Sequence, residues 1–208
     1  MRKEKQPDKR VADRAQERSI TEKRRRGEPL LPGDEQFLRQ NTGSIENTKS
    51  EEEFPNWKTV KLGALKSGDA YRKALKKVGM KISAHANDLL HKIAVAPEET
   101  DVDLVVASVD DLGLNEGGSY KSVYARGLQL GLVLCPAEVG PALRLSHNDQ
   151  PRGGWLRIAM EPITNSEGDL NVFELMSDGG KELRLGADDG NPDGFLGPYF
   201  RLIFMRPK

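Results

Sequence analysis

The chain of 208 residues has one cysteine, three histidines and no net charge. Its single thiol, Cys135, can form neither an internal disulfide nor a cysteine zinc site, which fits a reducing compartment. No apolar run approaches the roughly 20 residues that span a bilayer, and the charged first residues lack the apolar core of a secretory signal. We therefore expect a soluble, cytoplasmic protein.

Metal-ligating patterns are scarce. His85 and His91 are six residues apart and His147 is remote from both, so the spacing predicts no zinc site. The segment 189–194 has the D-x-N-x-D-G spacing of a calcium loop, but Phe200 stands where such a loop needs a bidentate glutamate. We interpret this segment as an acidic turn, and we predict neither a metal nor a cofactor.

The balance of 32 basic and 32 acidic residues conceals an asymmetry along the chain. Residues 1–100 contain 22 basic and 16 acidic residues, whereas residues 101–208 contain 10 and 16, so the halves carry +6 and −6. The two halves could neutralise each other, or the basic half could bind an anionic partner. Both interpretations stay open from the sequence.

Large apolar residues are rare in residues 1–53. Such a segment cannot bury enough apolar surface to offset the conformational entropy lost on ordering. We predict a disordered, charged tail, whose basic cluster Lys23–Arg26 could contact phosphate. Phe54 and Trp57 stand at the start of the part that is richer in large apolar residues, and we predict a single globular domain over residues 54–208.

Three segments have the pattern of capped, amphipathic helices. The first begins after Ser67 and ends at Gly79, because serine is a good N-cap and glycine a common C-terminal residue. A second helix is expected after Ser83, and a third between Ser119 and Gly131.

A β-branched run at Val102–Val109 predicts a buried strand. Downstream, turn sequences rich in Gly, Asp and Asn separate short strand-like runs. These runs are Leu143–Ser146, Trp155–Met160, Val172–Met176, Glu182–Leu185 and Phe200–Met205. The pattern favours an α+β fold, with N-terminal helices over about 65–134 followed by a mostly antiparallel sheet of short strands over about 143–207.

One block of the sequence is specific enough to suggest a family. The sequence LGLVLCPAEVGPALRL (130–145), followed by DQP (149–151) and WLRIAMEPI (155–163), resembles a family of small uncharacterised bacterial proteins over about residues 57–207. The resemblance implies no activity and no catalytic residue. Members are sometimes labelled helicase, but this chain has no G-x-x-x-x-G-K-[ST] phosphate loop and is too short for two nucleotide-binding domains, so a helicase motor is excluded.

The block contains the candidates for catalysis. Cys135 precedes a proline, and a helix starting there could lower the thiol pKa, with His147 and Asp149 downstream as possible partners. Glu138 stands among apolar residues, which could make it a general acid. A small hydrolase at the turn 135–141 is therefore the alternative function. The favoured interpretation is structural, with a buried cysteine and a glutamate that accepts backbone hydrogen bonds.

Basic residues gather on the first predicted helix and its flanks, opposite the apolar face. They are Lys66, Arg72, Lys73, Lys76, Lys77 and Lys81. A polyanion could dock there through phosphate contacts, but aromatic residues are not interleaved, apart from Tyr71 on the apolar face, so stacking of single-stranded bases has little support in the sequence. We predict a non-enzymatic adaptor or accessory protein that binds nucleic acid or an acidic partner.

A sequence-specific version of that function would use a helix-turn-helix built from residues 119–130 and 136–143. Its recognition helix would contain Gly140 and Pro141, and Arg144 at its end would be the single basic residue. It would therefore offer few side chains that can contact bases. We therefore favour contacts that are independent of sequence.

Overall fold

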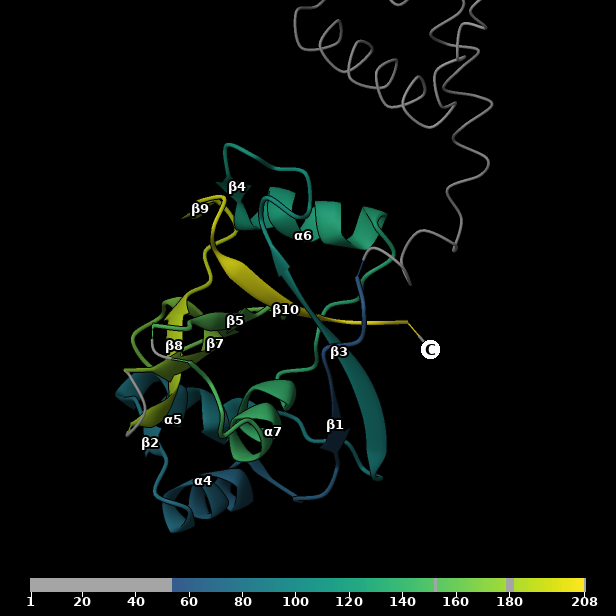
Figure 1. Cartoon of the computed structure of the whole chain (residues 1–208). Coiled ribbons are helices and arrows are strands. Elements are labelled where there is room, and N and C mark those ends of the chain that lie inside the picture. The colour runs from purple at the N-terminus through teal and green to yellow at the C-terminus, as the bar shows by residue number, and fades with distance from the viewer. Residues whose placement is uncertain (1–53, 152, 179–181, 208) are drawn as a thin grey trace, which may run out of the picture. The chain divides into compact units, whose positions relative to one another are not determined.

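The computed structural model describes residues 54–151, 153–178 and 182–207, and this part has an α+β fold (Figure 1). Four helices surround a large, curled and mostly antiparallel sheet, which confirms the predicted fold class. The tail predicted to be disordered, residues 1–53, lies outside the described residues together with its basic cluster.

The main sheet has eight strands and draws on both halves of the chain. Seven of them follow the order β1-β3-β10-β5-β7-β8-β2, and β6 pairs with β7. The strands are β1 Lys58–Leu62, β2 Lys81–Ile82, β3 Thr100–Ser108, β5 Leu156–Ile158, β6 Ile163–Thr164, β7 Leu170–Ser177, β8 Leu183–Asp189 and β10 Arg201–Met205. Only the β10–β5 and β2–β8 pairs are parallel. A separate two-stranded sheet joins β4 (Gly118–Ser119) and β9 (Phe195–Leu196).

The three predicted helices are α4 (Gly68–Lys77), α5 (Ala84–Lys92) and α6 (Tyr120–Gln129). Each begins as expected, because the hydroxyl of the preceding serine accepts a hydrogen bond from a backbone N–H of the first turn. Gly79 and Gly131, which follow α4 and α6, have φ angles of 78° and 82°. Both are left-handed positions that favour glycine, so the predicted C-terminal ends are confirmed.

The order of elements differs in part from the prediction. The strands β1 to β3 lie among the first helices, so the helices do not all precede the sheet. In addition, Leu143–Ser146, predicted as a strand, is the second half of a fourth helix, α7 (Val139–Ser146). Pro141 is compatible with that helix because it occupies the first turn, where a backbone N–H has no partner within the helix.

Helices pack on the sheet in two separate places (Figure 1). α7 packs against α4, β1, β7 and β8, and α5 packs against β7 and β8. α6 lies at the other end, beside β4 and β9, and its Gly127 rests on Phe204 of β10. Leu128 of α6 is 50% exposed. None of the described helices is both long and apolar enough to cross a lipid bilayer.

Candidate functional site

Cys135 is part of the core. Only 4% of the residue is exposed, its N–H donates to the carbonyl of Ala159 at 2.7 Å, and its Sγ lies 3.3 Å from the carbonyl oxygen of Ile203. Burial raises the pKa of the thiol, which opposes formation of the nucleophilic thiolate. The helix begins at Val139 and not at the proline after the cysteine, so its N-terminus does not activate the sulfur.

Glu138 holds together three segments that are distant in sequence. Its carboxylate accepts hydrogen bonds from Gly63 N, from the Tyr71 hydroxyl and from Ala96 N, each at 2.7 Å. The residue is only 1% exposed, and both of its carboxylate oxygens are engaged. This arrangement matches the structural alternative, a buried acceptor for backbone N–H groups, and leaves no oxygen directed at a substrate.

His147 is also buried, and its recorded contacts are with other residues than those of Cys135. Its Nδ1 is 2.7 Å from a carboxylate oxygen of Asp149, and its ring packs edge-on against Trp57 with the centroids 5.0 Å apart. Burial lowers its pKa. Of the imagined Cys-His-Asp set, the structure joins only His147 and Asp149, since Cys135 makes its contacts with Ala159 and Ile203.

The candidate helix-turn-helix is wrong. α6 and α7 lie at opposite ends of the described part and pack on different elements (Figure 1). Residues 139–144 of α7 are all buried, so this helix has no face to insert into a DNA groove. In the segment between the two helices, Val133 forms an isolated β-bridge with Met205.

The calcium-like segment is a set of turns. Asp189 Oδ1 accepts a hydrogen bond from Asn191 N at 2.8 Å, and Asn191 Oδ1 accepts one from Asp193 N at 3.0 Å. These side-chain oxygens are therefore used as local backbone acceptors. Across residues 54–207, apart from positions 152 and 179–181, no group of three His, Cys, Asp or Glu side chains is arranged to hold a metal ion.

Three of the six predicted binding residues are held by contacts with neighbouring groups. Lys66 Nζ donates to the Gly63 carbonyl at 2.9 Å, Arg72 contacts Asp69 and lies 2.6 Å from His91 Nε2, and Lys81 forms an ion pair with Glu182. Lys66 and Lys81 thus tie the segments that flank α4 to their neighbours, and Arg72 joins α4 to α5.

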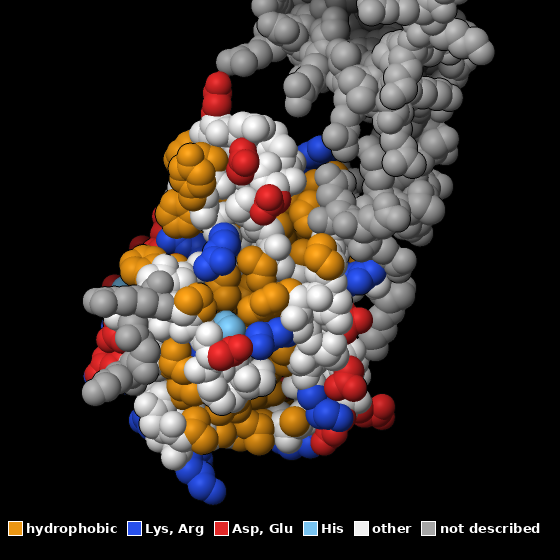
Figure 2. Space-filling view, in the orientation of Figure 1, with side chains coloured by type: hydrophobic (Ala, Val, Ile, Leu, Met, Phe, Trp, Pro, Cys, Tyr) orange, Lys and Arg blue, Asp and Glu red, His pale blue; other side chains and the backbone are white. Residues whose placement is uncertain are grey.

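The other three, Lys73, Lys76 and Lys77, are exposed and form no hydrogen bond or ion pair with another described residue. Their i, i+3 and i+4 spacing puts them side by side on α4, away from the buried Tyr71 and Leu75. We call them the α4 lysine cluster. Figure 2 shows basic side chains at the lower end of the molecule, where α4 lies in Figure 1.

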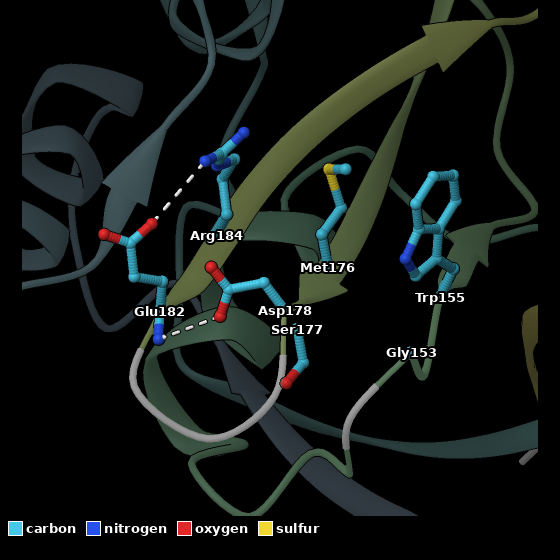
Figure 3. A pocket seen from close by; sticks show the side chains of 7 residues that line it. All are labelled: Gly153, Trp155, Met176, Ser177, Asp178, Glu182 and Arg184. Atoms are coloured by element: carbon cyan, nitrogen blue, oxygen red, sulfur yellow. Dashed lines mark hydrogen bonds and ion pairs between the residues drawn. The ribbon is translucent and has the colours of Figure 1, made fainter.

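A pocket that the sequence did not predict lies where β5, β7 and β8 meet (Figure 3). It has a volume of about 240 Å³ and is lined by Gly153, Trp155, Met176, Ser177, Asp178, Glu182 and Arg184. Trp155 is 51% exposed. These residues come from three segments that become neighbours only through strand pairing, and the lone sequence signal was the tryptophan of the WLRIAMEPI block.

β5 is anchored beside that pocket by Arg157, two residues after Trp155. Its guanidinium donates to Glu174 at 3.0 Å and to the Tyr120 hydroxyl at 2.7 Å, and it also contacts Asp188. The strand is thus tied to β7, α6 and β8 by a buried cation with all of its charge compensated.

Comparison of the chain with protein-family models, with curated proteins and with solved structures finds no match. The geometry described above is therefore the basis on which a function is proposed.

Proposed function

We propose that the protein is a non-enzymatic adaptor that binds nucleic acid through the α4 lysine cluster. The observation that carries this proposal is that Lys73, Lys76 and Lys77 are exposed and unpaired within the described part, whereas the other predicted binding residues have partners. The groups considered for catalysis are used by the fold, because Cys135 is buried and Glu138 is fully hydrogen-bonded.

The energetics of the helix support an anionic partner. Like charges at i, i+3 and i+4 repel each other by a few tenths of a kcal/mol per pair. Their place in the last turns of α4, where the helix dipole favours cations, offsets part of that cost. An anion bound across the three side chains would relieve the remaining repulsion. Lysine acts as a point charge, which suits contacts with phosphate that do not depend on the bases.

The test is binding of the full chain to fluorescein-labelled duplex DNA at increasing salt. Three phosphate contacts should give a slope of log K against log salt of about −2.7, because each contact on B-form DNA contributes about −0.9. Binding should show little dependence on sequence. Absence of salt-dependent binding to duplex and to single strands would refute the proposal and favour an acidic protein partner.

Charge-reversal variants locate the surface. Lys73→Glu, Lys76→Glu and Lys77→Glu should each weaken binding, and the triple variant should abolish it while keeping the helix, since glutamate is a good helix former. Lys121→Glu, an exposed lysine on α6 at the far end of the structure, changes the net charge equally and is the matched control. Equal losses in the control and in the α4 variants would contradict the assignment to α4.

A further inference from the structure

We propose that a row of four side chains, Trp155, Met176, Arg184 and Lys81, continues the α4 lysine cluster into a track for single-stranded nucleic acid. One base would stack on Trp155 while the adjoining phosphates contact Arg184 and Lys81. This inference rests on the proposed function and specifies the form of nucleic acid that is bound. We call these four residues the Trp155 row.

Strand register creates the row. Lys81 of β2 pairs with Arg184 of β8, and Arg184 pairs with Met176 of β7. Trp155 immediately precedes β5, whose Leu156 pairs with Leu175, so the tryptophan lies beside Met176. Trp155, Met176 and Arg184 line one pocket, and Figure 3 shows their side chains following one another across the sheet.

The chemistry changes from cationic to aromatic along the row. Neighbouring strands are about 4.8 Å apart, so Arg184 and Lys81 stand about 10 and 15 Å from Trp155. A half-exposed indole next to a polarizable thioether is a platform for an unstacked base of any identity. The paired bases of a duplex cannot reach such a platform, which is why the row favours single strands.

The two carboxylates of the pocket have different roles. Glu182 contacts both Lys81 and Arg184, and the hydrogen bond from Lys81 lowers its pKa, so it stays ionised and holds the two cations in place. Asp178 accepts a hydrogen bond from Glu182 N at 3.2 Å, and none of the cations in the described ranges pairs with it. Asp178 therefore repels an anionic occupant and would attract a cationic one.

The row also continues the surface already proposed. Only three residues separate the end of α4 at Lys77 from Lys81 on β2, and α4 packs against β2. A strand bound at the α4 lysine cluster would thus meet Lys81, then Arg184, then the indole. Apart from the buried Tyr71, no aromatic residue is interleaved with the basic residues of α4, and Trp155 is 74 residues away from Lys81 in the chain.

The experiment compares fluorescein-labelled oligo(dT) with a duplex of equal length, using the full chain. Trp155→Ala should weaken oligo(dT) binding about 5- to 150-fold, the range expected for one stacked base, and leave duplex binding almost unchanged. Trp155→Phe should keep most of the affinity. In a Trp57→Phe background, where Trp155 is the only remaining tryptophan, oligo(dT) should quench the fluorescence.

Two further variants test the charges of the pocket. Asp178→Asn, which keeps an acceptor for Glu182 N, should tighten oligo(dT) binding, whereas tighter binding is not expected for the exposed control Asp193→Asn. Arg184→Ala should weaken binding and make the salt slope shallower by about 0.7, the contribution of one phosphate on a single strand.

The outcomes separate the two proposals. If the triple α4 variant loses binding but Trp155→Ala binds oligo(dT) as well as the wild type, the Trp155 row is refuted and the α4 surface stands. If Asp178→Asn weakens binding, the occupant of the pocket is cationic and the inference is overturned. If the chain binds neither polymer, both proposals fall.

Discussion

At the scale of single residues, the side chains that looked most reactive in the sequence are those that the fold uses most heavily. Glu138 joins the segment after β1, the helix α4 and the segment after α5 through three hydrogen bonds. Hydrogen bonds to a charged acceptor are each worth about 1.5 to 3 kcal/mol, and an orphaned buried donor is costly. The stability of the protein should therefore depend on this one carboxylate.

Glu138→Gln should lower the free energy of unfolding by about 2–3 kcal/mol, because an amide nitrogen would face backbone donors. Tyr71→Phe removes only one of the three hydrogen bonds and should cost about 1 kcal/mol. The measurement is urea denaturation followed by circular dichroism. The exposed Glu161→Gln is the control, expected within about 0.5 kcal/mol of the wild type. Equal stability of Glu138→Gln and this control would contradict the structural role.

Cys135 should react slowly with iodoacetamide at neutral pH in the native protein, because burial raises the thiol pKa and blocks access. Alkylation should accelerate strongly when urea unfolds the chain. Cys135→Ala should reduce stability and leave nucleic-acid binding unchanged. Rapid alkylation of the native protein below pH 7 would instead support a nucleophilic role for this cysteine.

His147 should make stability depend on pH. Burial, together with Lys58 and Arg144, lowers its pKa below the ordinary value of 6.5, while Asp149 opposes the shift. Below pH 6.5 the unfolded chain then binds more protons than the folded one. The contribution of His147 to the free energy of unfolding is therefore fully present above pH 6.5 and is lost as the pH falls below it. The slope of the free energy of unfolding against pH that is due to this one group should not exceed about 1.4 kcal/mol per pH unit. His147→Gln should flatten this part of the profile, and the exposed His85→Gln should not.

At the scale of elements, helices that begin with a local capping signal could be predicted from the sequence, whereas the helix that depends on tertiary contacts could not. Ser67, Ser83 and Ser119 mark helix starts through hydrogen bonds within one turn, so α4, α5 and α6 could be predicted from the sequence. α7 could not, because its first residues lack a capping side chain and its helicity depends on packing. Gly140 lets this helix approach Phe173 of β7, a contact that no local pattern records.

Gly140→Ala should destabilise the protein by about 1–3 kcal/mol, since the added Cβ would lie 2.8 Å from the Phe173 side chain. Phe173→Ala removes the Cγ and Cδ2 atoms that the new Cβ would meet and keeps only Cβ, so Gly140→Ala combined with Phe173→Ala should lose less than the sum of the two single changes. The four unfolding free energies form a double-mutant cycle that measures this coupling. Additive losses would show that the two residues do not compete for the same space.

At the scale of the whole molecule, pairing between distant segments decides the candidate site. The basic character of α4 was predictable, because Lys73, Lys76 and Lys77 are close in sequence and opposite an apolar face. The neighbourhood of Trp155 and Lys81 was not, since it follows from the register of four strands. Some charges of the basic half of the chain are also neutralised by the acidic half within the fold, where Lys58 pairs with Asp149 and Lys81 with Glu182.

The central place of β10 in the sheet has a consequence for synthesis on the ribosome. β10 is the last described strand, yet it alone connects the pair β1–β3 to the group β5, β7, β8 and β2. During translation the edges of β3 and β5 stay unpaired until residues 201–205 leave the exit tunnel. A premature stop before Arg201 should therefore yield two open sheet fragments that aggregate or require a chaperone, even though most of the chain has been made.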